Sequence, residues 1–186
     1  MSLQQRNKSR RTLLLTLAVF VLPVVLAKLA LELQWFEYGV TNQGQLSAQE
    51  LTLADLGLNQ ADYKEQWLLL YRVPKACDEL CKETLLVVNN TYTLLGKELP
   101  RVTPVALFEQ QLAELEQKSL RHHKWQQVAL PSKAAEHILA KQLVIVDPLG
   151  NVVMSHQAPT VKEKLSVFGK AILADMKKLL KYSRVG

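Results

Sequence analysis

The sequence predicts an α/β domain that follows a single membrane-spanning helix. Residues 12–27 form an uncharged apolar run near the N-terminus. A short apolar strand at 67–71 leads through a turn into a helix-prone stretch at 78–95, which begins beside the chain's only two cysteines. Further apolar runs then alternate with helix-prone segments up to the C-terminus. This alternation is typical of a sheet covered by helices.

The size and charge of the chain limit its architecture and its partners. Its 186 residues, 48% of them hydrophobic, are enough for one compact domain with an accessory segment, and too few for two ordinary domains. The net charge is +6, but five of the 23 basic residues and only one of the 17 acidic residues precede Gln34. The remaining chain therefore carries a net charge of +2 and has no basic stripe interleaved with aromatic residues, which argues against a nucleic-acid partner.

The first 33 residues predict a membrane anchor. Residues 1–11 form a polar, basic tail, and residues 12–33 reach about the 20 residues that a bilayer-spanning helix needs if Lys28 snorkels. Pro23 would bend this helix without preventing insertion. A cleaved signal peptide has the same order of basic and apolar segments, but this apolar stretch is longer and lacks a clear cleavage site. We therefore expect an uncleaved anchor.

The charges that flank the anchor predict its orientation. Basic residues precede it, and Glu32 and Glu37 follow, so the N-terminus is expected in the cytoplasm and the domain outside. In a bacterium this corresponds to a single-pass inner-membrane protein with a periplasmic domain. Residues 34–66 form a lead-in segment, whose aromatic cluster near Trp35 is suited to the membrane interface or to docking on the domain. Residues 67–186 form the domain.

The two cysteines lie where a strand leads into a helix N-terminus. Unpaired N–H groups and the helix dipole favour negative charge there, and so favour ionisation of a thiol. Asp78 and Glu79 lie between Cys77 and Cys81 and oppose ionisation, so the net effect on either thiol pKa is not fixed by the sequence. The i, i+4 spacing places both sulfur atoms on one helix face, close enough to form a disulfide or to bind one Cu(I) ion.

Two interpretations of the cysteine pair follow. A C-x3-C spacing by itself is compatible with a small structural disulfide or with two buried thiols. The strand, turn and helix context favours a redox or metal-binding pair, because thioredoxin-like folds place reactive sulfur at this position. In that case Cys77 and Cys81 are the catalytic residues.

The segments after the cysteine helix alternate between strand and helix patterns. They are, in order, a strand at 100–108, a helical stretch at 109–120, a strand at 126–130, a short helix at 132–140, strands at 143–146 and 152–155 joined by an Asp-Pro-Leu-Gly-Asn turn, and a helix at 161–182. Pro104 predicts an edge position or a bulge in its strand. The last helix is amphipathic, with its apolar side expected against the sheet and most of its lysines on the other side.

In this order, the motifs resemble the SCO family of membrane-anchored, thioredoxin-like cytochrome c oxidase assembly proteins, and more closely its small proteobacterial relatives. The residues that carry the resemblance are Asn42-Gln43-Gly44-Gln45-Leu46, Trp67-Leu68-Leu69-Leu70-Tyr71, Pro74 with Cys77 and Cys81, Leu95-Gly96-Lys97-Glu98 with Arg101-Val102, Asp147-Pro148-Leu149-Gly150-Asn151, and Leu180-Lys181-Tyr182-Ser183. The match spans the whole chain, including the anchor.

The resemblance implies a copper function. In the SCO family two cysteines and a distal histidine hold copper, which implies a Cu(I) site formed by Cys77, Cys81 and His137. It also implies a role in loading or reducing the copper site of cytochrome c oxidase, with the copper-bearing subunit of the oxidase as the partner. In the family the histidine ligand lies on the segment that precedes the strand leading into the Asp-Pro-x-Gly turn, and His137 lies near that position, a little further from the turn than in the family.

We therefore expect one of two functions. The first is thiol–disulfide exchange or Cu(I) handling at Cys77 and Cys81 in oxidase assembly, which would make the protein a thiol–disulfide oxidoreductase. The alternative is a membrane-tethered interaction module of the oxidase, in which the disulfide is only structural. Lys82, which replaces the proline that usually follows the second cysteine in the family, favours the alternative.

Overall fold

The computed structural model describes residues 3–32, 42–47, 50–109 and 125–183. The chain divides into two compact units, Met1–Thr41 and Asn42–Gly186. The predicted aromatic cluster near Trp35, and most of the helical stretch predicted at 109–120, lie outside the described residues.

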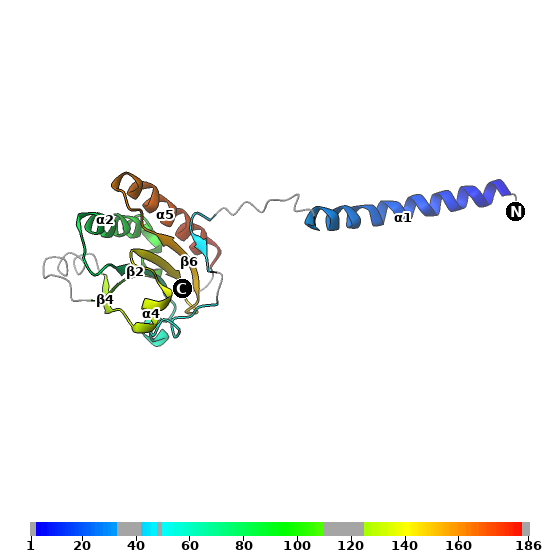
Figure 1. Ribbon diagram of the computed structural model, residues 1–186. Coiled ribbons are helices and arrows are strands. Elements are labelled where there is room, and N and C mark those ends of the chain that lie inside the picture. The colour runs from blue at the N-terminus through cyan, green and yellow to red at the C-terminus, as the bar shows by residue number, and fades with distance from the viewer. Residues whose placement is uncertain (1–2, 33–41, 48–49, 110–124, 184–186) are drawn as a thin grey trace. The chain divides into compact units, whose positions relative to one another are not determined.

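The described part of the first unit is one long helix, α1 (Leu3–Glu32) (Figure 1). Its segment Arg10–Ala30 has 21 residues and a mean hydropathy of 2.5. Among the described residues, this is the one helix that is long and apolar enough to cross a membrane, although a signal sequence has the same properties. The predicted N-terminal apolar helix is therefore confirmed, and Pro23 lies within it.

The second unit is built around a six-stranded sheet (Figure 1). Its strands are β1 (Gln45–Leu46), β2 (Trp67–Val73), β3 (Val102–Phe108), β4 (Gln126–Ala129), β5 (Gln142–Val146) and β6 (Val152–Gln157), in the spatial order β1-β6-β5-β2-β3-β4. Strands β2, β3 and β4 are parallel, whereas β5 pairs antiparallel with both β2 and β6, and β6 pairs antiparallel with β1.

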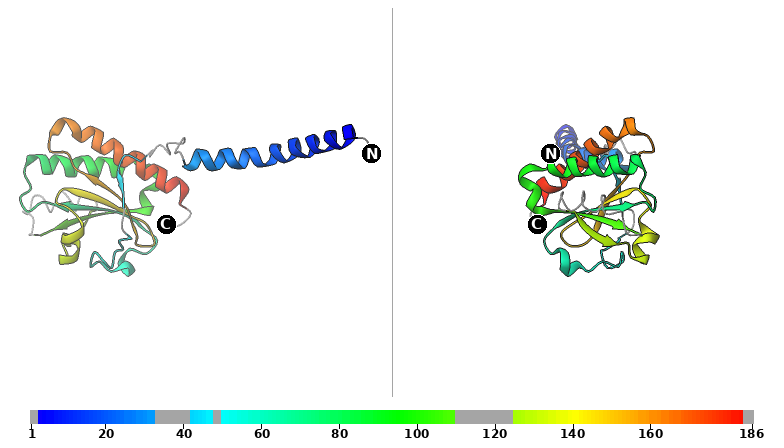
Figure 2. Two further views of the ribbon diagram at one scale, coloured as in Figure 1. Left: turned by 45° about the vertical axis from the view of Figure 1, so that its right-hand side comes forward. Right: turned by 90° about the vertical axis from the view of Figure 1, so that its left-hand side faces the viewer.

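Helices cover both faces of this sheet. They are α2 (Glu79–Thr93), α4 (Ser132–His137) and α5 (Leu165–Tyr182), with short 3-10 helices at Gln60–Tyr63, Gly96–Arg101 and Lys162–Lys164. Helices α2 and α5 lie side by side on one face (Figure 2). The opposite face is covered by α4 and by the segment that precedes β2. The fold is therefore a three-layer α/β arrangement, as the sequence predicts.

Strand β2 contributes to the core on both sides of the sheet. Leu69 and Tyr71 belong to the apolar cluster under α2 and α5, and Leu68 and Leu70 belong to the cluster under α4. A strand that is buried on both faces needs apolar residues at every position, which explains its uninterrupted apolar sequence. Every residue of both clusters lies between positions 53 and 180, so the core of the domain is complete without α1.

The segment before β2 is part of the domain from Asn42 onward. Leu53, Leu56 and Tyr63 are buried in the cluster under α4, and β1 extends the sheet by pairing with β6. The division of the chain into compact units therefore places the start of the domain near Asn42, within the predicted lead-in 34–66. The apolar residues of this segment pack on the sheet face that α2 and α5 leave uncovered.

Pro104 lies in a strand that is internal overall. Strand β3 is hydrogen-bonded to β2 on one side and β4 on the other, which differs from the predicted edge strand. The pairing of β3 with β4 begins only at Val105, however, so on that side β3 is still an edge at Pro104. A missing N–H is tolerated there because no neighbouring strand needs it.

A buried polar pair joins α5 to the start of the domain. The Asp175 carboxylate accepts hydrogen bonds from the backbone N–H groups of Gln43, at 3.0 Å, and Gly44, at 2.8 Å. His156 Nε2 lies 3.3 Å from Asp175 Oδ2, without hydrogen-bonding geometry, and both side chains are almost completely buried. A Cβ atom on Gly44 would lie 2.6 Å from His156 Nε2, so only glycine fits at this position.

Burial determines the charge state of His156. Desolvation lowers the pKa of its imidazole below the usual value, and the nearby Asp175 carboxylate opposes this shift only in part. The imidazole is therefore neutral at neutral pH, and the negative charge of Asp175 is satisfied by the backbone N–H groups of residues 43 and 44.

Candidate functional site

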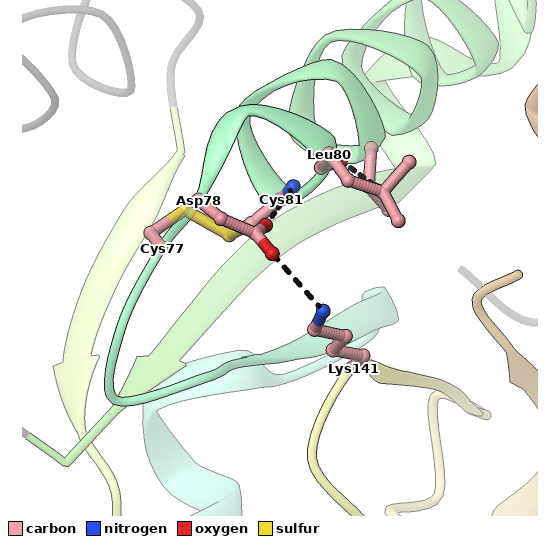
Figure 3. The surroundings of a disulfide bond; sticks show 6 residues. Cys77, Asp78, Leu80, Cys81 and Lys141 are labelled. Atoms are coloured by element: carbon pink, nitrogen blue, oxygen red, sulfur yellow. Dashed lines mark hydrogen bonds and ion pairs between the residues drawn. A yellow bond between two sulfur atoms is a disulfide. The ribbon is translucent and has the colours of Figure 1, made fainter. Parts of the chain in front are cut away.

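Cys77 and Cys81 form a disulfide at the end of β2 where α2 begins (Figure 3). Their Cα atoms are 5.1 Å apart. Cys81 lies in the first turn of α2 with 1% of its surface exposed, and it packs in the core under the helix. Cys77 lies in the connection before the helix and is only half-buried. Cys77 is therefore the more exposed of the two residues.

Asp78 caps α2 between the two cysteines. Its backbone is extended, and its Oδ1 atom accepts a hydrogen bond of 2.8 Å from the backbone N–H of Cys81. This carboxylate satisfies one of the N–H groups that a helix start leaves unpaired. The Asp78 carboxylate thereby occupies an N–H group that would otherwise stabilise a Cys81 thiolate. Its own negative charge also disfavours that thiolate.

Lys141 provides a positive charge at the same place. Its Nζ atom lies 3.7 Å from Asp78 Oδ2 (Figure 3). Its backbone has φ +62°, a left-handed conformation that residues other than glycine seldom adopt. Two hydrogen bonds of 3.0 Å, one with Arg72 and one with Ala158, hold that conformation. Such held, uncommon conformations cluster at functional sites.

Sequence reasoning missed Lys141. One lysine among many carries no pattern, and its approach to Asp78 depends on a contact between residues 63 positions apart. One signal was present, because Lys141 lies in the segment just before β5, where the SCO resemblance places a functional residue. The structure therefore adds Lys141 and Asp78 to the surroundings of the disulfide.

We expect Lys141→Ala to slow cleavage of the disulfide by small thiols and Asp78→Asn to accelerate it, each by about two- to fivefold. The attacking thiolate and the leaving thiolate both carry negative charge, which Lys141 attracts and Asp78 repels. Initial rates of reduction of the oxidised protein, measured at low ionic strength, test this. Added salt should diminish both effects, and shifts in the same direction would contradict the electrostatic explanation.

An ionic network fixes the strand ends around the disulfide. The Glu109 carboxylate pairs with Arg72 and, at 3.0 Å, with Lys75, and these hydrogen bonds lower its pKa below the usual value. The Arg72 guanidinium also donates to the backbone carbonyls of Ala135 and Ile138. The network thus joins the ends of β2 and β3 to the end of α4, which gives the β2–α2 connection a rigid base.

His137 lies apart from this group. It is exposed at the end of α4, on the sheet face opposite α2, where it lines a cavity of about 310 Å³ together with Leu56 and Val144. In the part of the chain that the structure describes, no three His, Cys, Asp or Glu side chains gather to hold a metal ion. The structure therefore brings Cys77 and Cys81 together without His137, and the three-residue copper site stays a prediction.

The order of the sheet, the helices on both faces and the disulfide where β2 leads into α2 define a thioredoxin-like protein. The chain belongs to the family described as transmembrane-like, thioredoxin-like, C-terminal domain, whose model matches residues 67–183. The predicted α/β thioredoxin-like fold after an N-terminal apolar helix is thereby confirmed. No match was found among curated proteins.

The chain is similar to several solved structures at low sequence identity. A mutant of Xanthomonas campestris peroxiredoxin Q is 17% identical, with a TM-score of 0.52 over 72% of this chain and 98% of that chain. A thiol:disulfide interchange protein from Bacteroides sp. is 17% identical, with a TM-score of 0.46 over 76% and 91%. Copper-bound ScoI from Bradyrhizobium japonicum is 14% identical, with a TM-score of 0.42 over 60% and 87%. At 17% identity the similarity to peroxiredoxin Q identifies the fold alone, and ScoI is only a distant structural match.

Proposed function

We propose that this protein is a membrane-anchored thiol–disulfide redox protein in which Cys77 and Cys81 cycle between disulfide and dithiol. One observation carries the proposal: the chain's two cysteines are bonded across a helix N-terminus, with Cys77 only half-buried and Cys81 buried. That asymmetry suits a pair in which one sulfur meets the partner and the second resolves the intermediate.

The exchange proceeds in two steps. In the reducing direction, the Cys77 thiolate attacks one sulfur of a partner disulfide, the partner's S–S bond breaks, and its other sulfur leaves as a thiolate that takes up a proton. The Cys81 thiolate then attacks the Cys77 sulfur and releases the partner's second sulfur as a thiolate. Two electrons pass to the partner, and Cys77 and Cys81 end as the observed disulfide. The reverse sequence oxidises a partner dithiol.

The finer proposal concerns the place and the partner. The basic tail, the apolar helix and the acidic residues after it support a bacterial inner-membrane location with the domain in the periplasm. The SCO-like motifs support the copper-bearing subunit of cytochrome c oxidase as the partner. After reduction, the thiolates of Cys77 and Cys81 suit Cu(I), a soft ion that thiolates select.

Equilibration of the anchor-free domain in glutathione buffers tests the redox proposal. We expect two thiols to appear on mild reduction, with a midpoint above about −300 mV, the limit below which structural disulfides fall. A disulfide that resists glutathione would instead support the alternative function, an interaction module with a structural disulfide. The deep burial of Cys81 favours that alternative.

Cu(I) titration of the reduced domain and of its His137→Ala variant tests the copper proposal. The reduced domain should bind one equivalent of Cu(I), and the Cys77→Ser variant should lose this binding.

A further inference from the structure

We propose that the outward face of α5 binds the anionic headgroups of the membrane that anchors the protein. This inference rests on the membrane attachment in the proposed function and is independent of the redox chemistry. The surface is a lysine stripe made of Lys170, Lys177, Lys178 and Lys181, all of them exposed. It extends along the last three turns of the helix.

Three of the four lysines of the stripe carry positive charge that no described acid pairs with. Asp175 is the only acidic residue of α5, and it is buried and occupied by the N–H groups of Gln43 and Gly44. Within the described part of the chain, Lys170, Lys177 and Lys181 take part in none of the ion pairs. Their charge is therefore not neutralised by the described residues, which is the electrostatic requirement for attraction to an anionic surface.

The helix also presents groups that suit a lipid interface. Its opposite side packs on the sheet through Phe168, Ile172 and Met176, so the lysines point away from the core. Val167 and Tyr182, near the two ends of α5, are 67% and 73% exposed. The Lys181 ammonium lies 5.5 Å from the centre of the Tyr182 ring. Lysines combined with exposed apolar and aromatic side chains are typical of helices that lie on membrane surfaces.

The path of the chain favours a membrane over another anionic partner. The domain begins at Asn42, whose side-chain oxygen accepts a hydrogen bond of 3.0 Å from Lys178, and the next two residues are bonded to Asp175. The start of the domain therefore lies beside the stripe. A domain tethered at this point meets the lipid surface far more often than an anionic partner in solution, which favours the membrane as the occupant.

Vesicle binding tests the proposal. The domain from Asn42 onward should sediment with vesicles that contain phosphatidylglycerol and not with pure phosphatidylcholine vesicles, and salt should weaken the binding. A lysine near an anionic surface contributes about fivefold to affinity. The double variant Lys170→Gln, Lys177→Gln should therefore bind roughly 25-fold more weakly.

The matched control is Lys64→Gln, Lys133→Gln, which removes the same charge from the sheet face opposite α5. It should bind within about twofold of the unchanged domain. Equal losses in both variants, or binding without preference for the anionic lipid, would overturn the proposal. Both variants leave the cysteines intact, so thiol exchange measured on the same samples reports separately on the redox function.

Discussion

Cys81→Ser is expected to stop thiol–disulfide exchange at a mixed disulfide on Cys77. Cys77, a half-buried residue, can still react with a partner, but the buried Cys81 thiol that resolves the intermediate is absent. An external thiol must then replace an intramolecular one, which should slow turnover by roughly a hundredfold or more. Mass spectrometry of the variant after incubation with oxidised glutathione should find one glutathione adduct per chain.

Cys77→Ser is the matched control for this experiment. The remaining Cys81 thiol has 1% of its surface exposed, so we expect it to form the adduct far more slowly. The double serine variant should form none. Equal adduct formation by the two single variants would contradict the assignment of Cys77 as the attacking residue, and no adduct in either would favour the structural role of the disulfide.

Asp175→Ala is expected to lower the free energy of unfolding of the domain by about 3 kcal/mol. The variant leaves the N–H groups of Gln43 and Gly44 without their acceptor and removes the charge beside buried His156. Urea unfolding at neutral pH tests this. Asp175→Asn keeps the shape and one acceptor oxygen, so its loss should be smaller, and a loss below about 0.5 kcal/mol for the alanine variant would contradict the role of this contact.

The pH dependence of stability gives a second measure of the same cluster. Burial lowers the pKa of His156 in the folded state, so the unfolded state binds a proton near pH 6.5 before the folded state does. The contribution of His156 to the free energy of unfolding is therefore present above its pKa in the unfolded state. It is lost as the pH falls through its pKa in the folded state. The Asp175→Ala variant lacks the carboxylate that partly opposes the lowering of the His156 pKa. The pH range over which stability is lost should therefore extend to lower pH in this variant.

Much of the fold could be predicted because its signals are local. The helix predicted at 78–95 is observed as Glu79–Thr93 with Asp78 as its cap, and the amphipathic pattern at 161–182 marks α5. The Asp-Pro-Leu-Gly-Asn turn also forms as expected: Asp147 accepts from the N–H groups of Leu149 and Asn151, and Gly150 has φ +87°. Each signal involves residues within a few positions of one another, where propensity and periodicity act.

The surroundings of the disulfide could not be predicted in the same way. The sequence singled out Cys77, Cys81 and His137, and the structure joins only the two cysteines in one group. The charged neighbour that it adds, Lys141, comes from the connection between α4 and β5. Its position depends on how that connection packs against β2 and β6, which no local pattern encodes.

The sequence by itself determined an apolar N-terminal helix, an α/β domain, and two cysteines at the start of a helix, because these depend on composition and short-range spacing. Only the tertiary structure decided that the start of the domain is held to α5 through Asp175, that Pro104 lies where β3 is not yet paired with β4, and that Lys141 faces Asp78. These features depend on strand register and on contacts between residues far apart in the chain, and such contacts form only when the whole core packs.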